Sequence, residues 1–163
     1  MHEKLLVLNM VLKNFQNIYK MILNPIKKKL LTKLTNNGNK FNSEKIFKKS
    51  IKLLQKNLKK NYKEIFKKSV INASPVVIVK QIKRRRKQIK EFPYIIHKTL
   101  RISLGLKSMV NTVKNKKKKN FFYKELTDEF LLTTANKSSS VKIRKDIYEN
   151  SFKTKKYANF RWF

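Results

Sequence analysis

The feature that most limits what this chain can be is its charge. Lysine and arginine supply 42 of 163 residues, and aspartate and glutamate supply only 9, which gives a formal net charge of +33. Self-repulsion at this charge density destabilises an isolated compact protein, and the same field attracts polyanions. We therefore expect the folded chain to act as one half of a complex whose other half is a polyanion.

The apolar content is nevertheless high enough for a folded core. Hydrophobic residues make up 40% of the chain and aromatic residues 11%, with only 2 glycines and 3 prolines. Disordered basic tails are poor in aromatic residues, and low-complexity linkers are rich in glycine and proline. A length of 163 residues suits one domain. Cysteine is absent, which excludes a disulfide, a thiolate metal site or a thiol nucleophile.

The first 21 residues differ from the rest of the chain. We assign residues 1–21 to a basic amphipathic extension and residues 22–163 to a single helical domain. The apolar stripe of the extension can bind an anionic membrane, but we favour docking on a neighbouring protein or on the rest of this chain. Glu3 and the lack of arginine there argue against a cleavable import peptide. The stripe is formed by Leu5, Leu8, Leu12, Phe15 and Tyr19.

Apolar residues spaced three and four apart predict helices over most of the chain. A first short helix is predicted over residues 26–35, ended by the turn residues Asn36–Asn39. Asn42 or Ser43 can cap the next helix. Its expected buried stripe is Ile46, Phe47, Ile51, Leu54 and Leu58.

A third helix has clear start and stop signals. Asn61 and Glu64 have the spacing of a capping box. The helix is predicted to end before Ser74-Pro75, because proline disfavours helical geometry in the preceding residue. Its expected inward residues are Ile65, Phe66, Ser69 and Val70.

The next segment predicts strands. Residues 76–79 are β-branched, residues 89–96 form a second extended stretch, and five consecutive cations at 83–87 lie between them. Pro93 restricts the second strand to an edge, which suits a two-stranded ribbon. The pattern predicts a β-hairpin at about residues 75–96 with a charged tip.

Three further helices follow the hairpin. They are predicted to begin near Lys98, after the lysine run 116–119, and at the N-cap candidates Ser138–Ser140. The fold class is therefore mainly α, a bundle of about six helices with a protruding two-stranded β-hairpin arm between helices three and four. The expected buried stripes are Ile102, Leu106, Met109, Val110 and Val113, then Phe122, Leu126 and Phe130, then Ile143, Ile147 and Phe152.

Nothing in the sequence predicts an enzyme, a cofactor or a metal site. There is no glycine-rich phosphate loop, no nucleophile paired with a base and no ligand cluster at metal spacing. Glu125, Asp128 and Glu129 are close enough in sequence to gather a cation, but acids paired with lysine in a structural role are the better interpretation. His97 is expected to stand at the entry of a helix.

Several segments in a fixed order resemble one protein family over about residues 22–162. The chain is similar to the bacterial-type small-subunit ribosomal protein seven, although the family's pair of glycines in the hairpin has no counterpart here. The resemblance implies six helices with a hairpin arm, and binding to the 3′ major domain of small-subunit rRNA during head assembly. It also implies neighbouring small-subunit proteins as partners, with exit-site tRNA and mRNA near the hairpin. The matching segments are Asn36–Lys40, Ser74–Lys80, Phe92–Ile96, Ala135–Ser138, Val141–Asp146 and Tyr157–Trp162.

Clusters of cations indicate which residues contact RNA. Affinity for RNA comes mainly from cations that displace counterions from phosphates, and arginines that persist in a lysine-rich chain favour bidentate phosphate or base contacts. Each cluster could instead be a solvated face, and the C-terminal aromatics could pack on the bundle rather than stack on bases. The expected RNA-binding residues are Lys40, Lys80, Lys83, Arg84, Arg85, Arg86, Lys87, Lys98, Arg101, Lys116, Lys117, Lys118, Lys119, Lys142, Arg144, Lys145 and Arg161.

The preference for lysine over arginine indicates the base composition of the gene. Lysine outnumbers arginine by 36 to 6, and asparagine, isoleucine and phenylalanine are plentiful, as in proteins from genes rich in adenine and thymine. We expect an organellar gene, mitochondrial first and plastid second, and no membrane partner. Two other functions share the charge: an architectural DNA-binding protein and a basic helical protein associated with membranes.

Overall fold

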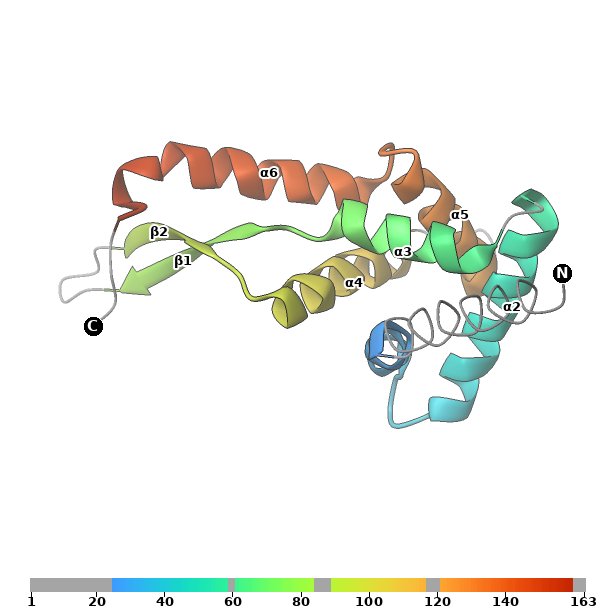
Figure 1. The fold of residues 1–163 in the computed structure, drawn as a ribbon. Helices are drawn as coiled ribbons and strands as arrows, with labels where there is room; N and C mark the ends of the chain where they lie inside the picture. The colour runs from blue at the N-terminus through green and yellow to red at the C-terminus, as the bar shows by residue number, and fades with distance from the viewer. Residues whose placement is uncertain (1–24, 59–60, 84–88, 117–120, 160–163) are drawn as a thin grey trace, which may run out of the picture.

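A computed structural model describes residues 25–58, 61–83, 89–116 and 121–159 (Figure 1). The prediction of a mainly helical chain, with a two-stranded hairpin between the third and fourth helices, is confirmed. The described elements are a helix over residues 25–34, α2 (Lys40–Leu58), α3 (Tyr62–Ala73), β1 (Val77–Lys83), β2 (Ile89–Ile95), α4 (Lys98–Asn115), α5 (Phe122–Thr134), α6 (Ser139–Lys153) and the 3-10 helix η2 (Lys155–Tyr157).

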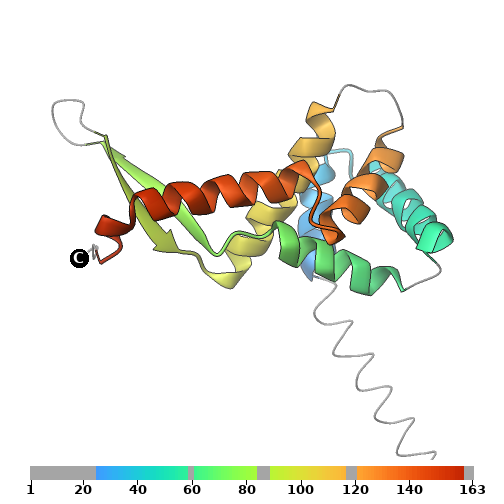
Figure 2. The same ribbon diagram turned by 90° about the horizontal axis from the view of Figure 1, so that it is seen from above.

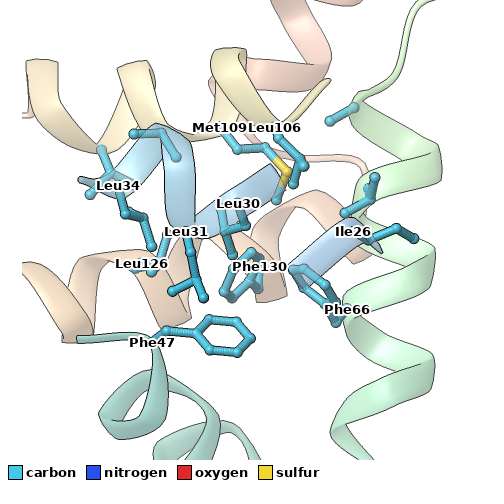
Figure 3. Close-up of a cluster of buried hydrophobic side chains, with 14 of the residues drawn as sticks. Ile26, Leu30, Leu31, Leu34, Phe47, Phe66, Leu106, Met109, Leu126 and Phe130 are labelled. Carbon is cyan, nitrogen blue, oxygen red and sulfur yellow. The ribbon is translucent and has the colours of Figure 1, made fainter. Parts of the chain in front are cut away.

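The helix over residues 25–34 and helices α2 to α5 surround one hydrophobic core. Phe66 of α3 lies at its centre, edge-on to Phe47 and Phe130 with ring centroids 5.9 and 5.4 Å away. Edge-to-face packing of this kind adds to the free energy gained by burying the rings. Leu30 and Leu106 close the core from the first helix and α4 (Figure 3). Figure 3 shows that apolar side chains from these helices meet in a single core.

The predicted helix boundaries hold where a capping residue is present. Asn61 is the N-cap of α3, and its side chain accepts a hydrogen bond from the backbone N–H of Lys63. The same helix ends at Ala73, before Ser74, as the following proline predicts. The predicted cap of α2, Asn42 or Ser43, is wrong by three or four residues. Asn39 holds that position, because its Oδ1 accepts from the N–H of Asn42.

A tight turn connects the first helix to α2. Asn37 and Gly38 have φ values of 50° and 75°. Asparagine and glycine tolerate this left-handed region better than other residues do. The run predicted to end the first helix therefore forms the turn, which brings α2 back against α5.

The hairpin projects from the bundle, and α6 runs beside it (Figures 1 and 2). The strands pair antiparallel from Val77 opposite Ile95 to Lys83 opposite Ile89, with Pro93 opposite Val79. We refer to β1, β2, α6 and η2 together as the arm.

The predicted inward stripe of α6 is wrong at two of its three positions, and the third, Ile147, is half-buried. Ile143 is 41% exposed and Phe152 is 69% exposed, whereas Ser140 and Val141 are buried. The reason is that α6 packs against the bundle only where it begins and then runs along the hairpin, so its later apolar residues have no helix layer to face. In α2 the predicted residues Phe47 and Leu54 are buried, and the side chain of Leu58 lies outside the described part of the chain.

Candidate nucleic-acid interface

The predicted RNA-binding residues fall into two groups. The first lies outside the described residues and comprises Arg84, Arg85, Arg86, Lys87, Lys117, Lys118, Lys119 and Arg161, together with the side chain of Lys83. The second is placed by the structure and comprises Lys40, Lys80, Lys98, Arg101, Lys116, Lys142, Arg144 and Lys145.

The arm is held together by contacts between segments that are far apart in the sequence. The backbone N–H of Val76 donates a 3.0 Å hydrogen bond to the phenolic oxygen of Tyr148 on α6. The rings of Phe92 in β2 and Tyr157 in η2 lie 5.3 Å apart, and Phe92 is only 4% exposed. These contacts fix α6 against the hairpin, so the cations of both lie on one body.

Two cations of the arm lie close to aromatic rings. The Lys80 ammonium lies 4.4 Å from the centroid of the Tyr94 ring, and the Arg144 guanidinium carbon lies 5.9 Å from that of Tyr148. The Nε atom of Arg144 is buried and makes no hydrogen bond within the described structure. Lys142 and Lys145 are exposed on the same helix. The structure thus places Lys80 and residues 142–145 on the same arm, in β1 and in α6, about sixty positions apart in the chain.

Two further predicted cations lie at the base of the arm, in the first turn of α4. Lys98 is exposed and Arg101 is half-buried, and no acidic residue occupies that turn. The N-terminus of a helix carries unpaired N–H groups and a partial positive charge. Both cations therefore add to a positive surface where the hairpin joins the bundle. Lys40 is exposed at the start of α2, away from the arm.

Lys116 has a partner inside the protein. Its ammonium lies 3.2 Å from the carboxylate of Glu129, whose side chain is only 1% exposed. The hydroxyl of Ser140 donates to the other oxygen of that carboxylate over 2.9 Å. The prediction of a structural acid paired with lysine is confirmed for Glu129. An RNA contact by Lys116 stays a prediction.

A buried carboxylate lies beside the start of α6, the helix that carries Arg144. Ser138 caps α6 by accepting from the N–H groups of Ser140 and Val141, and Glu129 lies beside this N-terminus through Ser140. The positive end of the helix therefore already has a negative group near it, and a bound phosphate is not needed to balance it. An RNA contact by Arg144 stays a prediction.

One cationic surface was missed by the sequence reasoning. Lysines recur along α2 at helical spacing and all are exposed. The signal that could have found them is their period of three and four residues. Without a structure, such lysines are interpreted as the solvated side opposite a buried stripe. They are Lys45, Lys48, Lys49, Lys52 and Lys56.

Within the described residues, no three His, Cys, Asp or Glu side chains are grouped so that they could hold a metal ion. In the part of the chain that the structure describes, no helix has the length and apolarity needed to cross a membrane. The positive charge is the dominant chemical property of the described surface.

The described structure is a helical bundle with a cationic hairpin arm. Comparison with known sequences identifies the family to which the chain belongs. The family described as Ribosomal protein S7p/S5e matches residues 7–151. The chain is 27% identical over 140 residues to small ribosomal subunit protein uS7 of Aliivibrio salmonicida, covering 83% of this chain and 88% of that protein. It is 30% identical over 117 residues to small ribosomal subunit protein uS7c of Euglena longa, covering 72% of this chain and 65% of that protein.

The chain therefore belongs to the Ribosomal protein S7p/S5e family. This makes it a structural protein of the small ribosomal subunit and not an enzyme. The resemblance drawn from the segments of the sequence is confirmed. The match begins at residue 7, within the segment assigned to an extension, and it ends before the final aromatic residues.

Proposed function

We propose that this protein is a structural component of the small ribosomal subunit of an organelle, in mitochondria or, as second choice, in plastids. The observation that carries the proposal is the family match over residues 7–151. The lysine-rich composition supports an organellar gene. One relative, uS7c of Euglena longa, is of the plastid type, which keeps the second choice open.

Within the subunit, the protein binds the 3′ major domain of the rRNA and helps to assemble the head. Its charge of +33 supplies the counter-charge that brings RNA helices together. Folded rRNA is recognised mainly through its shape and its backbone. An arm that carries cations away from the bundle is suited to binding folded rRNA, because it can contact an RNA helix that the bundle itself does not contact.

The residues proposed to contact RNA are those of the arm and of the connecting segments. Lys80, Lys142 and Lys145 contact phosphates, and the half-buried Arg144 adds the charge of its guanidinium beside them. Lys98 and Arg101 extend this surface to the bundle. The other residues that the sequence predicts to bind RNA keep that proposed role. The hairpin tip lies near exit-site tRNA and mRNA.

Sedimentation tests the assignment to the ribosome. In organelle extracts, the protein is expected to travel with the small subunit after treatment with DNase and to leave it after treatment with RNase. Release by DNase would support the architectural DNA-binding alternative. Recovery in the membrane fraction after RNase would support the membrane alternative. Separate fractions of mitochondria and plastids from the same cells decide the organelle.

A variant tests the role of the hairpin tip. Replacing residues 83–87 with alanine is expected to weaken binding to small-subunit rRNA and to leave the helical circular dichroism unchanged, because the described core is built from residues of the helices. The salt slope is expected to fall by roughly 0.7 to 0.9 for every phosphate that the variant no longer neutralises. A parallel loss of helicity would show that the segment is structural and would contradict this part of the proposal.

A further inference from the structure

The outward face of α2 carries a row of lysines without a matching row of acids. Lys45, Lys48, Lys52 and Lys56 follow one another at intervals of three and four residues, and each is exposed. In the described part of the chain none of them lies within ion-pair distance of a carboxylate. Like charges at this spacing on a helix repel one another. This face therefore gains stability when a polyanion binds to it.

The row borders a groove that has an apolar floor. The groove has a volume of about 580 Å³ and is lined by residues of the first helix, α2 and the start of α3. Phe47 and Ile51 contribute its apolar lining, and Lys27 lies 5.9 Å from the centroid of the Phe47 ring. Among the described residues, Glu44 is the single acid in the lining. We call this cavity the α2 groove.

Two aromatic rings at the α2 groove are accessible to a ligand. Phe41 is 75% exposed, although it is a large apolar side chain in the first turn of α2. Tyr62, the first residue of α3, lines the same groove. Both rings therefore line the groove together with lysine side chains.

We propose that the α2 groove is a second RNA-binding site, which takes a single-stranded RNA segment. Lys45, Lys48 and Lys52 contact its phosphates, one base stacks on Phe41 at the start of α2, and Tyr62 offers a second ring near the other end of that helix. The inference rests on the proposed function only in that the protein works bound to rRNA. It goes beyond that function because it assigns RNA contacts to a surface outside the arm and the connecting segments.

The chemistry of the groove favours RNA over an acidic protein segment. An acidic peptide would pair with the lysines but would leave Phe41 without a partner. Sites for single-stranded nucleic acid combine a positive groove that follows the backbone with aromatic side chains on which bases stack. A lysine row with an exposed ring at one end and apolar lining beside it has both properties.

The location of the groove gives the second site a separate role. Both views place α2 at the end of the molecule opposite the hairpin (Figures 1 and 2). An RNA segment in the α2 groove and a segment bound to the arm are therefore different parts of the rRNA. The protein would hold them at a fixed separation set by the helical bundle.

Binding and crosslinking with the full-length chain test the proposal. The probe is a ten-nucleotide oligouridylate that carries one 4-thiouridine, titrated at several KCl concentrations. The groove variant K45Q/K48Q/K52Q is compared with K68Q/K107Q/K137Q, which removes three exposed lysines elsewhere. A third variant, K80Q/K142Q/K145Q, removes cations of the arm.

The groove variant is expected to bind about 10-fold more weakly than wild type, with a salt slope smaller by roughly 2, since three phosphates are no longer neutralised. The control variant is expected to change affinity less than about 3-fold. F41A is expected to weaken binding about 10-fold at an unchanged salt slope, because stacking and not charge is removed. Crosslinks are expected in the peptides that contain Phe41 and Tyr62.

Equal effects of the groove and control variants, or crosslinks that avoid both aromatic peptides, would overturn the inference. If polyglutamate displaced the probe from the groove while F41A bound RNA normally, the groove would be a protein-binding site and the inference would fail. In both cases the proposed function would survive as long as the arm variant still weakened binding. If the arm variant also bound RNA normally, the RNA contacts of the proposed function would fail as well.

Discussion

The ion pair between Lys116 and Glu129 provides the sharpest test of how the arm is anchored. It joins the end of α4 to the carboxylate of α5, which also accepts from Ser140 at the start of α6. The pair is asymmetric, because the Glu129 side chain is 1% exposed and that of Lys116 is 36% exposed. Removing the lysine therefore leaves a buried charge without a counter-charge, whereas removing the acid leaves a cation that water can solvate.

This asymmetry sets the expected magnitudes. Breaking a fully buried pair by removing one partner costs about 3–5 kcal/mol. Water screens the exposed part of Lys116, so we expect K116M to lose about 2–3 kcal/mol of unfolding free energy. E129Q keeps an oxygen that can accept from Ser140 and should lose about 1 kcal/mol. The double variant should be more stable than the sum of the single changes predicts, by about 2 kcal/mol.

The assay is urea unfolding of the full-length chain, followed by circular dichroism in 0.5 M KCl so that the excess positive charge is screened. A shift of the midpoint at a constant urea slope reports a change of stability alone. If K116M were within about 0.5 kcal/mol of wild type, given the usual effect of a neutral surface substitution, the pair would not stabilise the fold. Additive effects in the double variant would also refute the reasoning.

Three further substitutions test other parts of the fold. G105A should destabilise by about 1–3 kcal/mol, because an added Cβ would lie 2.5 Å from Ser74 Oγ and 3.0 Å from its Cα; an unchanged melting temperature would mean that α3 and α4 can separate freely. Y148F removes the acceptor for the N–H of Val76, so exchange of that amide should quicken while the bundle amides keep their rates; an exchange rate that is slower or unchanged would contradict the contact between α6 and the hairpin. N61A should cost about 1 kcal/mol in thermal unfolding through removal of the N-cap, and a stabilised variant would show that the cap is not needed.

The predicted fold succeeded where local signals are strong. The β-branched run before the cations and the proline in the second strand indicated a two-stranded ribbon, and the strands lie at Val77–Lys83 and Ile89–Ile95. The capping residue Asn61 and the proline after Ser74 fixed both ends of α3. These signals act within a few residues, so a single sequence reveals them.

The prediction failed where a residue's environment depends on distant segments. Ile143 and Ile147 have the spacing of a buried stripe, yet Ile143 is exposed and Ile147 is only half-buried, because α6 extends past the bundle along the hairpin. Periodicity indicates that a helix has an apolar face but does not indicate which layer covers it. The start of α2 was misplaced because Ser43, a good capping residue, is buried inside the helix and donates to the carbonyl of Lys40.

The candidate site was predicted in part for the same reason. Charge clustering identified Lys80 and residues 142–145, and the fold brings them onto one arm. The structural role of Lys116 depends on Glu129, thirteen positions away on the next helix, and the lysine count alone does not reveal it. The lysine row of α2 is distinctive only in combination with the groove beside it, which the fold creates.

Lysine reactivity in native small subunits tests the central claim most directly. The subunits are treated with an amine-acetylating reagent before and after digestion with RNase, and modified peptides are quantified. We predict that Lys80, Lys142 and Lys145 are protected in the intact subunit and react after RNase, while Lys107 changes little. Full reactivity of the three arm lysines in intact subunits, with no change after RNase, would contradict the claim that the arm is bound to RNA.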